Sequence, residues 1–262
     1  MMFLIKLLRK WSNVIIIKSE LEIDKLRKAG KIVAYAHEEI RKNIKAGMST
    51  YEIDQIAVKE ILKHGAKLGF KGYGGFPGNN CVSVNEEVVH GIPSKDRIVK
   101  SGDIVSVDLG SYIDGFYGDA ARTHAIGEVT EEVKKLVEVT RESFYKGLEF
   151  AKVGYRLSDI SNAIQVHCEK HGFSIVRDYV GHGVGRNLHE PPQIPNFGRP
   201  GRGPRLQKGM VLAIEPMVNI GSFEVETLND KWTVITKDKS YSAHYENTIV
   251  ITDGEPEILT TL

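Results

Sequence analysis

The stretch from Ser106 to Thr123, SVDLGSYIDGFYGDAART, predicts a β-hairpin that turns at Asp114-Gly115. This dipeptide is typical of a two-residue type I′ turn, because both central positions of that turn need positive φ. Counting outward from the turn sets the register as Ile113 opposite Phe116, Gly110 opposite Asp119, and Asp108 opposite Ala121. One short stretch therefore predicts two long antiparallel strands and the residues that share each of their faces.

Two aspartates share one face of this predicted hairpin. Asp108 and Asp119 are diagonal neighbours, about 7 Å apart at the backbone. Both lie inside apolar strand sequence and not at its tips. Carboxylates so placed repel each other unless a cation lies between them. We expect a metal site here, and the alternative is that one aspartate is a solvent-exposed turn residue.

A second group of candidate ligands lies in the C-terminal half. Glu215 ends the apolar run MVLAIEP, where an unpaired buried charge is costly. Glu246 lies in AHYENTIVIT, and in a continuous strand His244 and Thr248 share its face. His182 lies in a glycine-rich loop. Four carboxylates with one imidazole suit divalent first-row metals such as Mn, Fe(II) or Co, in a dinuclear site where four negative charges balance two dications.

The glycine-rich loop is VGHGVGRNLHEPPQIP, residues 180–195. A phosphate-binding loop needs a third glycine of the dinucleotide motif or a Lys-Ser/Thr after the loop, and a zinc protease helix needs H-E-x-x-H. The loop has neither pattern. Its glycines let the backbone approach something bulky, with His182 free to point at it, so we expect the wall of a metal site.

Charge and composition exclude several classes of protein. The 262 residues carry a net charge of +1, which gives no general attraction to nucleic acid or to anionic membrane. Two cysteines are too few for a disulfide framework, so we expect a reducing cytoplasm. The N-terminal residues 1–13 are interrupted by Lys6, Arg9 and Lys10, which argues against a signal peptide or a spanning helix. We expect this tail to be dispensable or untranslated.

Helix caps and strand patterns predict an α+β domain built from two similar halves. Ser19 with Glu22 and Ser49 with Glu52 form S-x-x-E capping boxes, each of which begins an amphipathic run. Two more helices are expected to begin at Thr130 and Ser158, where amphipathic runs also begin. Strand-like runs are CVSV, DIVSVDLG, FYGDAARTHAIG, GMVLAIEP, WTVIT and YSAHYENTIVIT. The order is helix, helix, strands, and then the same again.

Five motifs together resemble the type I methionine aminopeptidases of peptidase family M24. They are CVSVNEEVVHGIP, VDLGSYIDGFYGDAART, GHGVGRNLHEPPQIP, GMVLAIEPM and AHYENTIVIT, and they follow the family's order from about Ile15 to Ile258. The resemblance implies the pita-bread fold, in which two pseudo-symmetric αβ halves enclose a two-metal site on a curved antiparallel sheet. Glu246 lies only 31 positions after Glu215, which leaves no room for the helical insertion of type II enzymes.

The resemblance also implies roles for individual residues. The implied metal ligands are Asp108, Asp119, His182, Glu215 and Glu246, with Asp119 and Glu246 bridging two ions of Co, Mn, Fe(II), Ni or Zn. Glu215, His90 and His189 become the catalytic residues, the two histidines also holding substrate. The methionine pocket falls on Tyr73, Phe76, Cys81 and Trp232. Phe70 and Leu188 stand where relatives carry Cys and Phe.

The implied function is removal of the initiator methionine from nascent polypeptides when the second residue is small. We expect a single catalytic domain at residues 14–262, monomeric and cytoplasmic, that meets its substrates at the ribosome without reading nucleic acid or binding membrane. Two alternatives remain open. One is a proline-specific aminopeptidase or prolidase of the same fold, and the other is a metal-free binding protein on the same scaffold.

Overall fold

A computed structural model describes residues 14–262, so the predicted tail at 1–13 lies outside the described residues. Its helices are α2 (Glu20–Asn43), α3 (Thr50–Lys63), α4 (Glu131–Leu148) and α5 (Leu157–Lys170), with the short 3-10 helix η1 (Tyr73–Gly75). The strands of the first half are β1 (Lys67–Leu68), β2 (Cys81–Val84), β3 (Glu87–Val89), β4 (Ile104–Ile113) and β5 (Phe116–Ala125). Those of the second half are β6 (Ser174–Ile175), β7 (Gly181–Gly183), β8 (Glu190–Ile194), β9 (Val211–Ile214), β10 (Met217–Asn219), β11 (Val225–Thr227), β12 (Val234–Thr236), β13 (Ser242–His244), β14 (Asn247–Val250) and β15 (Glu257–Ile258).

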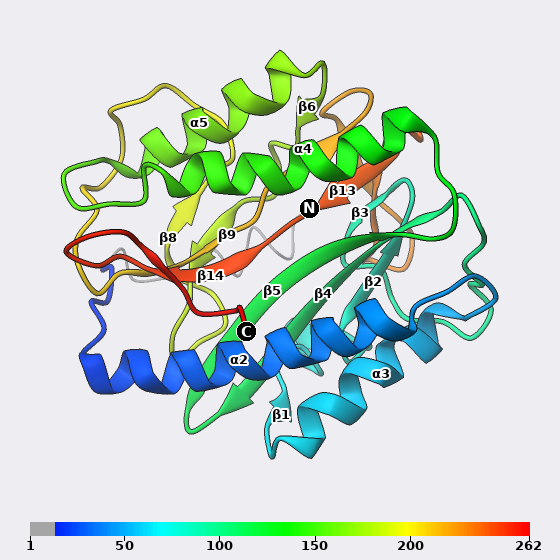
Figure 1. Ribbon diagram of the computed structural model, residues 1–262, viewed down its shortest axis with the longest axis horizontal. Helices are drawn as coiled ribbons and strands as arrows, with labels where there is room; N and C mark the ends of the chain where they lie inside the picture. Colours follow the sequence, from blue (N-terminus) through cyan, green and yellow to red (C-terminus); the bar gives the residue numbers. More distant parts are fainter. Residues whose placement is uncertain (1–13) are drawn as a thin grey trace.

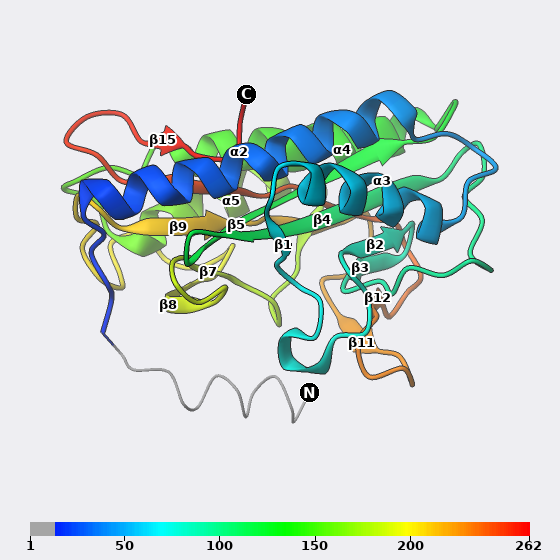
Figure 2. The same cartoon turned by 90° about the horizontal axis from the view of Figure 1, so that it is seen from below.

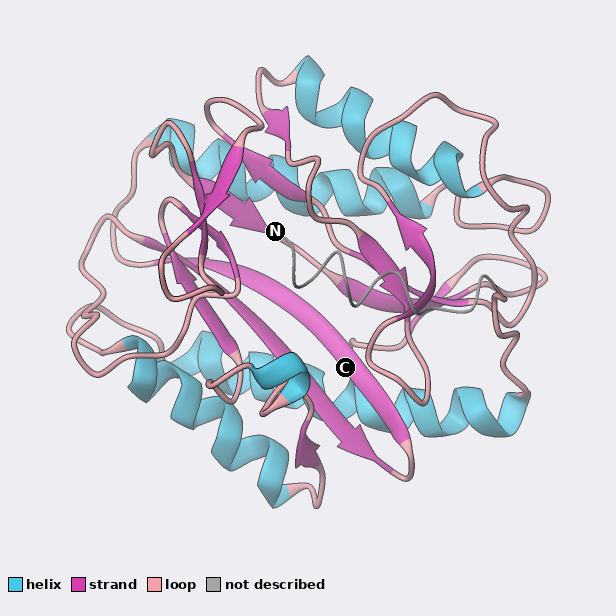
Figure 3. Ribbon diagram, turned by 180° about the vertical axis from the view of Figure 1, so that it is seen from behind, coloured by secondary structure: helices cyan, strands magenta, loops and turns pink. Residues whose placement is uncertain are grey.

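The helices form a layer over one face of the strands (Figures 1 and 2). α2 and α3 run together on one side, and α4 and α5 run together on the other, with β4, β5, β9 and β14 crossing between the two pairs (Figure 1). Seen from behind, the other face carries loops and short strands (Figure 3). Among residues 14–262, no helix is both long and apolar enough to cross a bilayer. The helix and strand order thus confirms an α+β protein.

The hairpin predicted from Asp114-Gly115 is confirmed. β4 and β5 pair with Ile113 opposite Phe116, Gly110 opposite Asp119, and Asp108 opposite Ala121. The turn residues have φ of 53° and 85°, the positive values that a type I′ turn requires. On its other edge β4 pairs with β2, so Cys81 lies opposite Asp108. The hairpin therefore places both aspartates and a predicted pocket residue in one sheet.

The helix starts follow their caps, with one correction. In the second capping box, the Ser49 N–H donates to the Glu52 carboxylate at 2.7 Å, and the Glu52 N–H donates to the Ser49 hydroxyl at 3.2 Å. The helix expected from Ser158 begins instead at Leu157. Its first turn is capped by Asp159, whose carboxylate accepts the Arg156 N–H at 2.7 Å. The Ser158 hydroxyl bonds the Arg202 carbonyl and is not a cap.

The predicted continuous strand over 241–252 is wrong, because it consists of two strands in different sheets. β13 pairs with β10, whereas β14 pairs with β9. Between them, the Tyr245 N–H donates to the Pro216 carbonyl at 3.2 Å and the Glu246 N–H donates to the Ala121 carbonyl at 3.0 Å. The chain thus leaves one ladder to contact β5 of the first half. This crossing joins the two halves next to Asp119.

Gly118 allows α2 to lie directly on β5. A Cβ at this position would lie 2.6 Å from the Ala29 carbonyl carbon and 2.7 Å from the Gly30 nitrogen, both in the helix backbone. Because backbone atoms cannot turn aside as a flexible side chain can, we expect Gly118→Ala to lower the free energy of unfolding by about 1–3 kcal/mol. Urea denaturation measures this change.

The matched control for that substitution is Gly254→Ala. A Cβ at Gly254 would meet nothing closer than the Thr252 hydroxyl at 4.0 Å. It should leave the urea midpoint within experimental error of the parent protein. Equal midpoints for the two variants would show that the helix has room to move away from β5.

Candidate metal centre and substrate pocket

A buried cluster of acidic and imidazole groups lies where the two halves meet. Asp119 on β5, His182 on β7 and Glu246 between β13 and β14 each offer a ligand atom, all within 4.8 Å of one another. The His182 Nε2 also lies 3.5 Å from the Glu215 Oε1 and 3.6 Å from the Asp119 Oδ2. Residues far apart in sequence thus face one small volume.

The hydrogen-bonding pattern of His182 fits a cation in this volume. Its Nδ1 lies 2.9 Å from the Gly183 carbonyl, which can only accept, so the proton is on Nδ1. Nε2 therefore presents a lone pair to the carboxylates of Asp119 and Glu215. Acceptors that face acceptors need a positive charge between them. A divalent metal ion would supply that charge.

Unpartnered buried atoms support the same interpretation. Among the described residues, Asp108 Oδ1, Asp119 Oδ1 and His244 Nε2 are buried without a hydrogen-bond partner. His244 Nε2 lies 3.6 Å from the Glu215 Oε2. Buried polar atoms are usually satisfied, so a group of unpartnered polar atoms around one point fits a cation-binding site. The donor set of carboxylates with imidazole suits a divalent first-row metal.

The carboxylates cannot all ionise in this environment without a counter-charge. Burial raises the pKa of Asp108 to about 7 and the pKa of Glu215 to about 7. Burial and the repulsion of neighbouring carboxylates raise the pKa values of Asp119 and Glu246 well above their usual range. Bound dications would return these groups to their charged forms.

Thr248, which the sequence predicted beside Glu246, and Arg122, which it did not indicate, both bond the backbone of this cluster. The Thr248 hydroxyl donates to the Asp119 carbonyl at 2.8 Å. The Arg122 guanidinium donates to the Glu246 carbonyl and, at 2.6 Å, to the Asn247 side-chain oxygen. Arg122 was missed because its partners lie more than a hundred positions away in the sequence. The one signal in the sequence is its position in β5. Arg122 lies three residues after Asp119 and therefore on the opposite face of the strand.

The four residues expected to form the methionine pocket do lie together. Tyr73, Phe76, Cys81 and Trp232 belong to one apolar cluster with Phe70 and Leu188. The rings of Phe76 and Trp232 meet edge to face with centroids 5.2 Å apart. Ile92 and Tyr117 also pack against this cluster, and no sequence signal had indicated them. Cys81 lies opposite Asp108, so the apolar cluster adjoins the acidic one.

The two catalytic histidine candidates lie between the clusters. His189 Nδ1 lies 2.9 Å from the Tyr73 hydroxyl, and its ring centroid is 4.2 Å from that of His182. The His90 ring meets that of Trp232 at 6.4 Å. His90 has a φ of 61°, a strained value for a residue with a side chain that is commonest at functional sites.

Both histidines are neutral at physiological pH. Burial lowers the pKa of His90 to about 4. Burial and the neighbouring histidines lower the pKa of His189 well below its usual range. A neutral imidazole offers one N–H donor and one acceptor, which suits hydrogen bonds to a peptide group.

A divalent-metal hydrolase built from two αβ halves is the class of protein that this fold and site define. Residues 24–253 match metallopeptidase family M24, and the chain belongs to that family. It is 56% identical over 247 residues to a methionine aminopeptidase from Clostridium acetobutylicum. The aligned residues are 94% of this chain and 99% of the relative. Within the family, the chain belongs with the methionine aminopeptidases.

Solved structures agree with this placement. The methionine aminopeptidase of Thermotoga maritima superposes with a TM-score of 0.94 at 52% identity, covering 95% of this chain and 100% of that one. The prolidase of Pyrococcus furiosus superposes with a TM-score of 0.77 at 24% identity, covering 99% of this chain and 67% of that one. The second likeness shows the shared pita-bread fold alone, and it does not favour the prolidase alternative.

Proposed function

We propose that this chain removes an N-terminal methionine from new polypeptides whose second residue is small, using a dinuclear metal centre. One hydrogen bond carries the proposal, because it joins the acidic cluster to the apolar cluster. It links the His189 Nδ1 and the Tyr73 hydroxyl, which lie 2.9 Å apart. His189 adjoins the acidic cluster at His182, and Tyr73 belongs to the apolar one. An apolar side chain bound in the second cluster would place its peptide bond at the first. The names of the relatives support this substrate.

Five side chains would hold two divalent ions, and these are Asp108, Asp119, His182, Glu215 and Glu246. Four carboxylate charges balance two dications, which supports two ions in place of one. When bound, such ions make a water molecule acidic enough to act as a nucleophile at neutral pH and bind a free amine. Co, Mn, Fe(II), Ni and Zn all suit this donor set.

The remaining roles belong to the protein's own groups. Glu215 lies between His182 and His244, so one oxygen can bind metal while the other accepts a proton. The Tyr73 hydroxyl, donating to His189 Nδ1, would keep the His189 proton on Nε2, where it can donate to the oxyanion of the reaction. His90 would hold the peptide nitrogen from the Trp232 side. The apolar cluster would exclude water around the methionine side chain.

The proposal predicts a specific pattern of peptide cleavage. Met-Ala-Ser should lose its methionine, whereas Met-Phe-Ser should be cut with a kcat/KM at least about 10-fold lower, because a bulky second residue must crowd the walls near His90. X-Pro dipeptides should resist cleavage. Release of free amino acid with each metal added in turn measures the pattern. Preferential cleavage of X-Pro peptides would favour the prolidase alternative, and no cleavage with any metal would favour the binding protein.

Tyr73→Phe should lower kcat/KM for Met-Ala-Ser about 10-fold, the usual effect of losing one hydrogen bond that orients a catalytic group. The pocket keeps its ring, so KM should change less than kcat. Tyr117→Phe is the matched control, because Tyr117 packs against the same cluster. An equal loss of kcat/KM in Tyr73→Phe and Tyr117→Phe would contradict the proposed role of the Tyr73 hydroxyl in orienting His189.

We also propose that residues 14–262 act as one monomeric catalytic unit on nascent chains in the cytoplasm. The small net charge supports a substrate recognised by its end and not by charge. Gel filtration of the active protein would test the monomer. Cleavage by residues 14–262 alone would test the boundary at Val14.

A further inference from the structure

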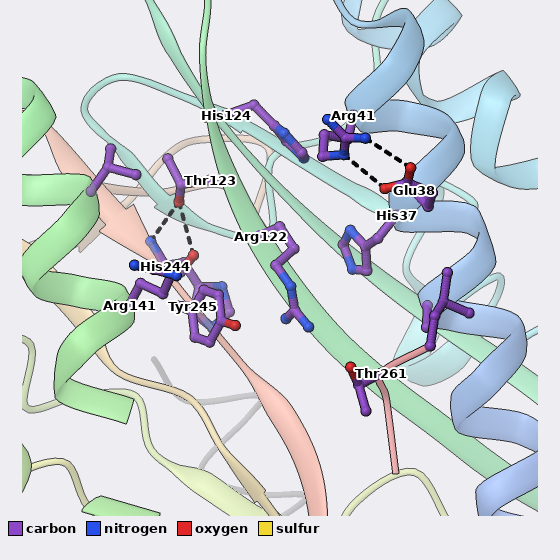
Figure 4. Close-up of a pocket in the computed structure, with 13 residues that line it drawn as sticks. His37, Glu38, Arg41, Arg122, Thr123, His124, Arg141, His244, Tyr245 and Thr261 are labelled. Carbon is purple, nitrogen blue, oxygen red and sulfur yellow. Dashed lines mark hydrogen bonds and ion pairs between the residues drawn. The ribbon is translucent and has the colours of Figure 1, made fainter. Parts of the chain in front are cut away.

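A cavity lies on the helix-covered side of the hairpin, on the face of β5 opposite Asp119. It occupies about 390 Å³ between α2 and α4, where β5 and β13 pass (Figure 4). Arg122 and His124 reach it from β5, on the face opposite Asp119, because side chains alternate along a strand. Asp119 thus lies on the other side of β5 from these two side chains, whereas His244, whose Nε2 faces Glu215, lines the cavity as well.

Positive charge predominates in this cavity. Three guanidinium groups line it, from Arg41, Arg122 and Arg141, against one side-chain carboxylate, that of Glu38. Glu38 is already paired with Arg41 through two hydrogen bonds of 2.7 and 2.8 Å. Among residues 14–262, neither Arg122 nor Arg141 forms an ion pair with a carboxylate. Two of the guanidinium groups in the cavity are therefore not paired with an aspartate or glutamate of the described residues.

Of Arg122 and Arg141, Arg122 has the guanidinium that needs a counter-charge more. Its guanidinium donates to the neutral oxygens of Ala121, Glu246 and Asn247, and it stacks on the Tyr245 ring at 4.5 Å. A partly buried guanidinium whose hydrogen-bond partners are all neutral keeps an uncompensated charge, which is costly. An anion in the cavity would remove that cost.

His37 adds a separate observation that points to a ligand. The side chain is 6% exposed, and its Nε2 lies 2.8 Å from the Ala120 carbonyl, so Nε2 carries the proton. Nδ1 is then an acceptor, and it is buried without a hydrogen-bond partner among the described residues. The ring lines the cavity near Arg122 (Figure 4). His124 Nε2 is likewise unpartnered.

We propose that this cavity binds a phosphate group that retains a proton. Its charged oxygens would accept hydrogen bonds from Arg122 and Arg141, and its P–OH would donate to His37 Nδ1. Near neutral pH inorganic phosphate has both kinds of oxygen, whereas sulfate has the charge and the size but no proton. A phosphate monoester offers the same charged oxygens, but because its second pKa is about 6 it keeps a P–OH only as the monoanion, at or below about pH 6.

Isothermal titration calorimetry of the metal-loaded protein tests the proposal with inorganic phosphate and with sulfate. We expect phosphate to bind the cavity at least about 10-fold more tightly than sulfate, since only phosphate satisfies His37. Arg141→Gln should weaken phosphate binding about 10-fold or more. Arg199→Gln, an exposed arginine outside the cavity, removes the same charge and should change nothing. Phosphoserine in a third titration, at about pH 6 where part of it keeps a P–OH, separates the sources, since it binds only if the cavity accepts an ester.

Two further variants separate the cavity from the metal centre and test the histidine. Asp119→Ala should retain phosphate binding in the cavity, because Asp119 faces the other side of β5. His37→Leu should lower the affinity for phosphate to that for sulfate. Equal affinities for phosphate and sulfate in the parent protein would overturn the proposal. So would phosphate binding that survives Arg141→Gln but disappears in Asp119→Ala.

Discussion

Asp119→Ala is expected to abolish tight metal binding and to lower kcat/KM for Met-Ala-Ser by at least about 10³-fold. Asp119 lies within 4.8 Å of ligand atoms of both His182 and Glu246, so its loss opens the centre of the proposed site. Metal polarisation contributes several kcal/mol of transition-state stabilisation, which corresponds to a loss of this size. Metal content by mass spectrometry and steady-state kinetics measure the two effects.

The folded structure should survive this substitution. Burial and neighbouring carboxylates raise the pKa of Asp119, so removing the group relieves repulsion in the metal-free protein. Asp114→Asn is the matched control on the same hairpin, because Asp114 is an exposed turn residue paired with Lys28 at 2.7 Å. Asparagine tolerates the positive φ of that turn. Unchanged metal stoichiometry in Asp119→Ala would reject its role as a ligand.

Glu215→Gln is expected to lower kcat for Met-Ala-Ser by about 10²–10⁴-fold with little change in KM, as for loss of a general base. Glutamine keeps the shape and one carbonyl donor but cannot accept a proton. Its fold should persist, and one metal site should weaken. Kinetics at increasing metal concentration separate the two roles, because added metal should refill the site without restoring the rate.

The control for this variant is Glu226→Gln, an exposed glutamate on β11. It should match the parent protein in both metal content and kcat. Recovery of the parent kcat by Glu215→Gln at high metal concentration would leave Glu215 as a ligand only. His90 would then be the next proton acceptor to test.

The sequence predicted correctly those features that neighbouring residues determine, and it failed where contacts between distant residues determine the structure. The β4–β5 register was correct because the Asp114-Gly115 turn alone sets it. The strand over 241–252 was wrong because its break comes from a hydrogen bond between Glu246 and Ala121, which no local pattern records. The predicted start of α5, Ser158, was one residue too late. The helix begins at Leu157, because the Asp159 carboxylate and not the Ser158 hydroxyl bonds the backbone at its first turn.

The same distinction holds for the site. Asp108 and Asp119 follow from the hairpin pattern, whereas the pocket residues came from family resemblance, since nothing in their local sequence brings Tyr73 to Trp232. The Arg122 contacts and the basic cavity could not be predicted at all. They depend on how α2 and α4 pack across β5, and thus on the complete tertiary structure.

The joining of the halves beside Asp119 also bears on when a peptide-cleaving site comes into existence. Asp108 and Asp119 belong to the first half, while His182, Glu215 and Glu246 belong to the second, so neither half contains the whole of the proposed ligand set. During synthesis the first half leaves the ribosome before the second has been translated. A chain at that stage would have no assembled centre. The proposed peptidase activity would therefore be absent until translation has passed Glu246.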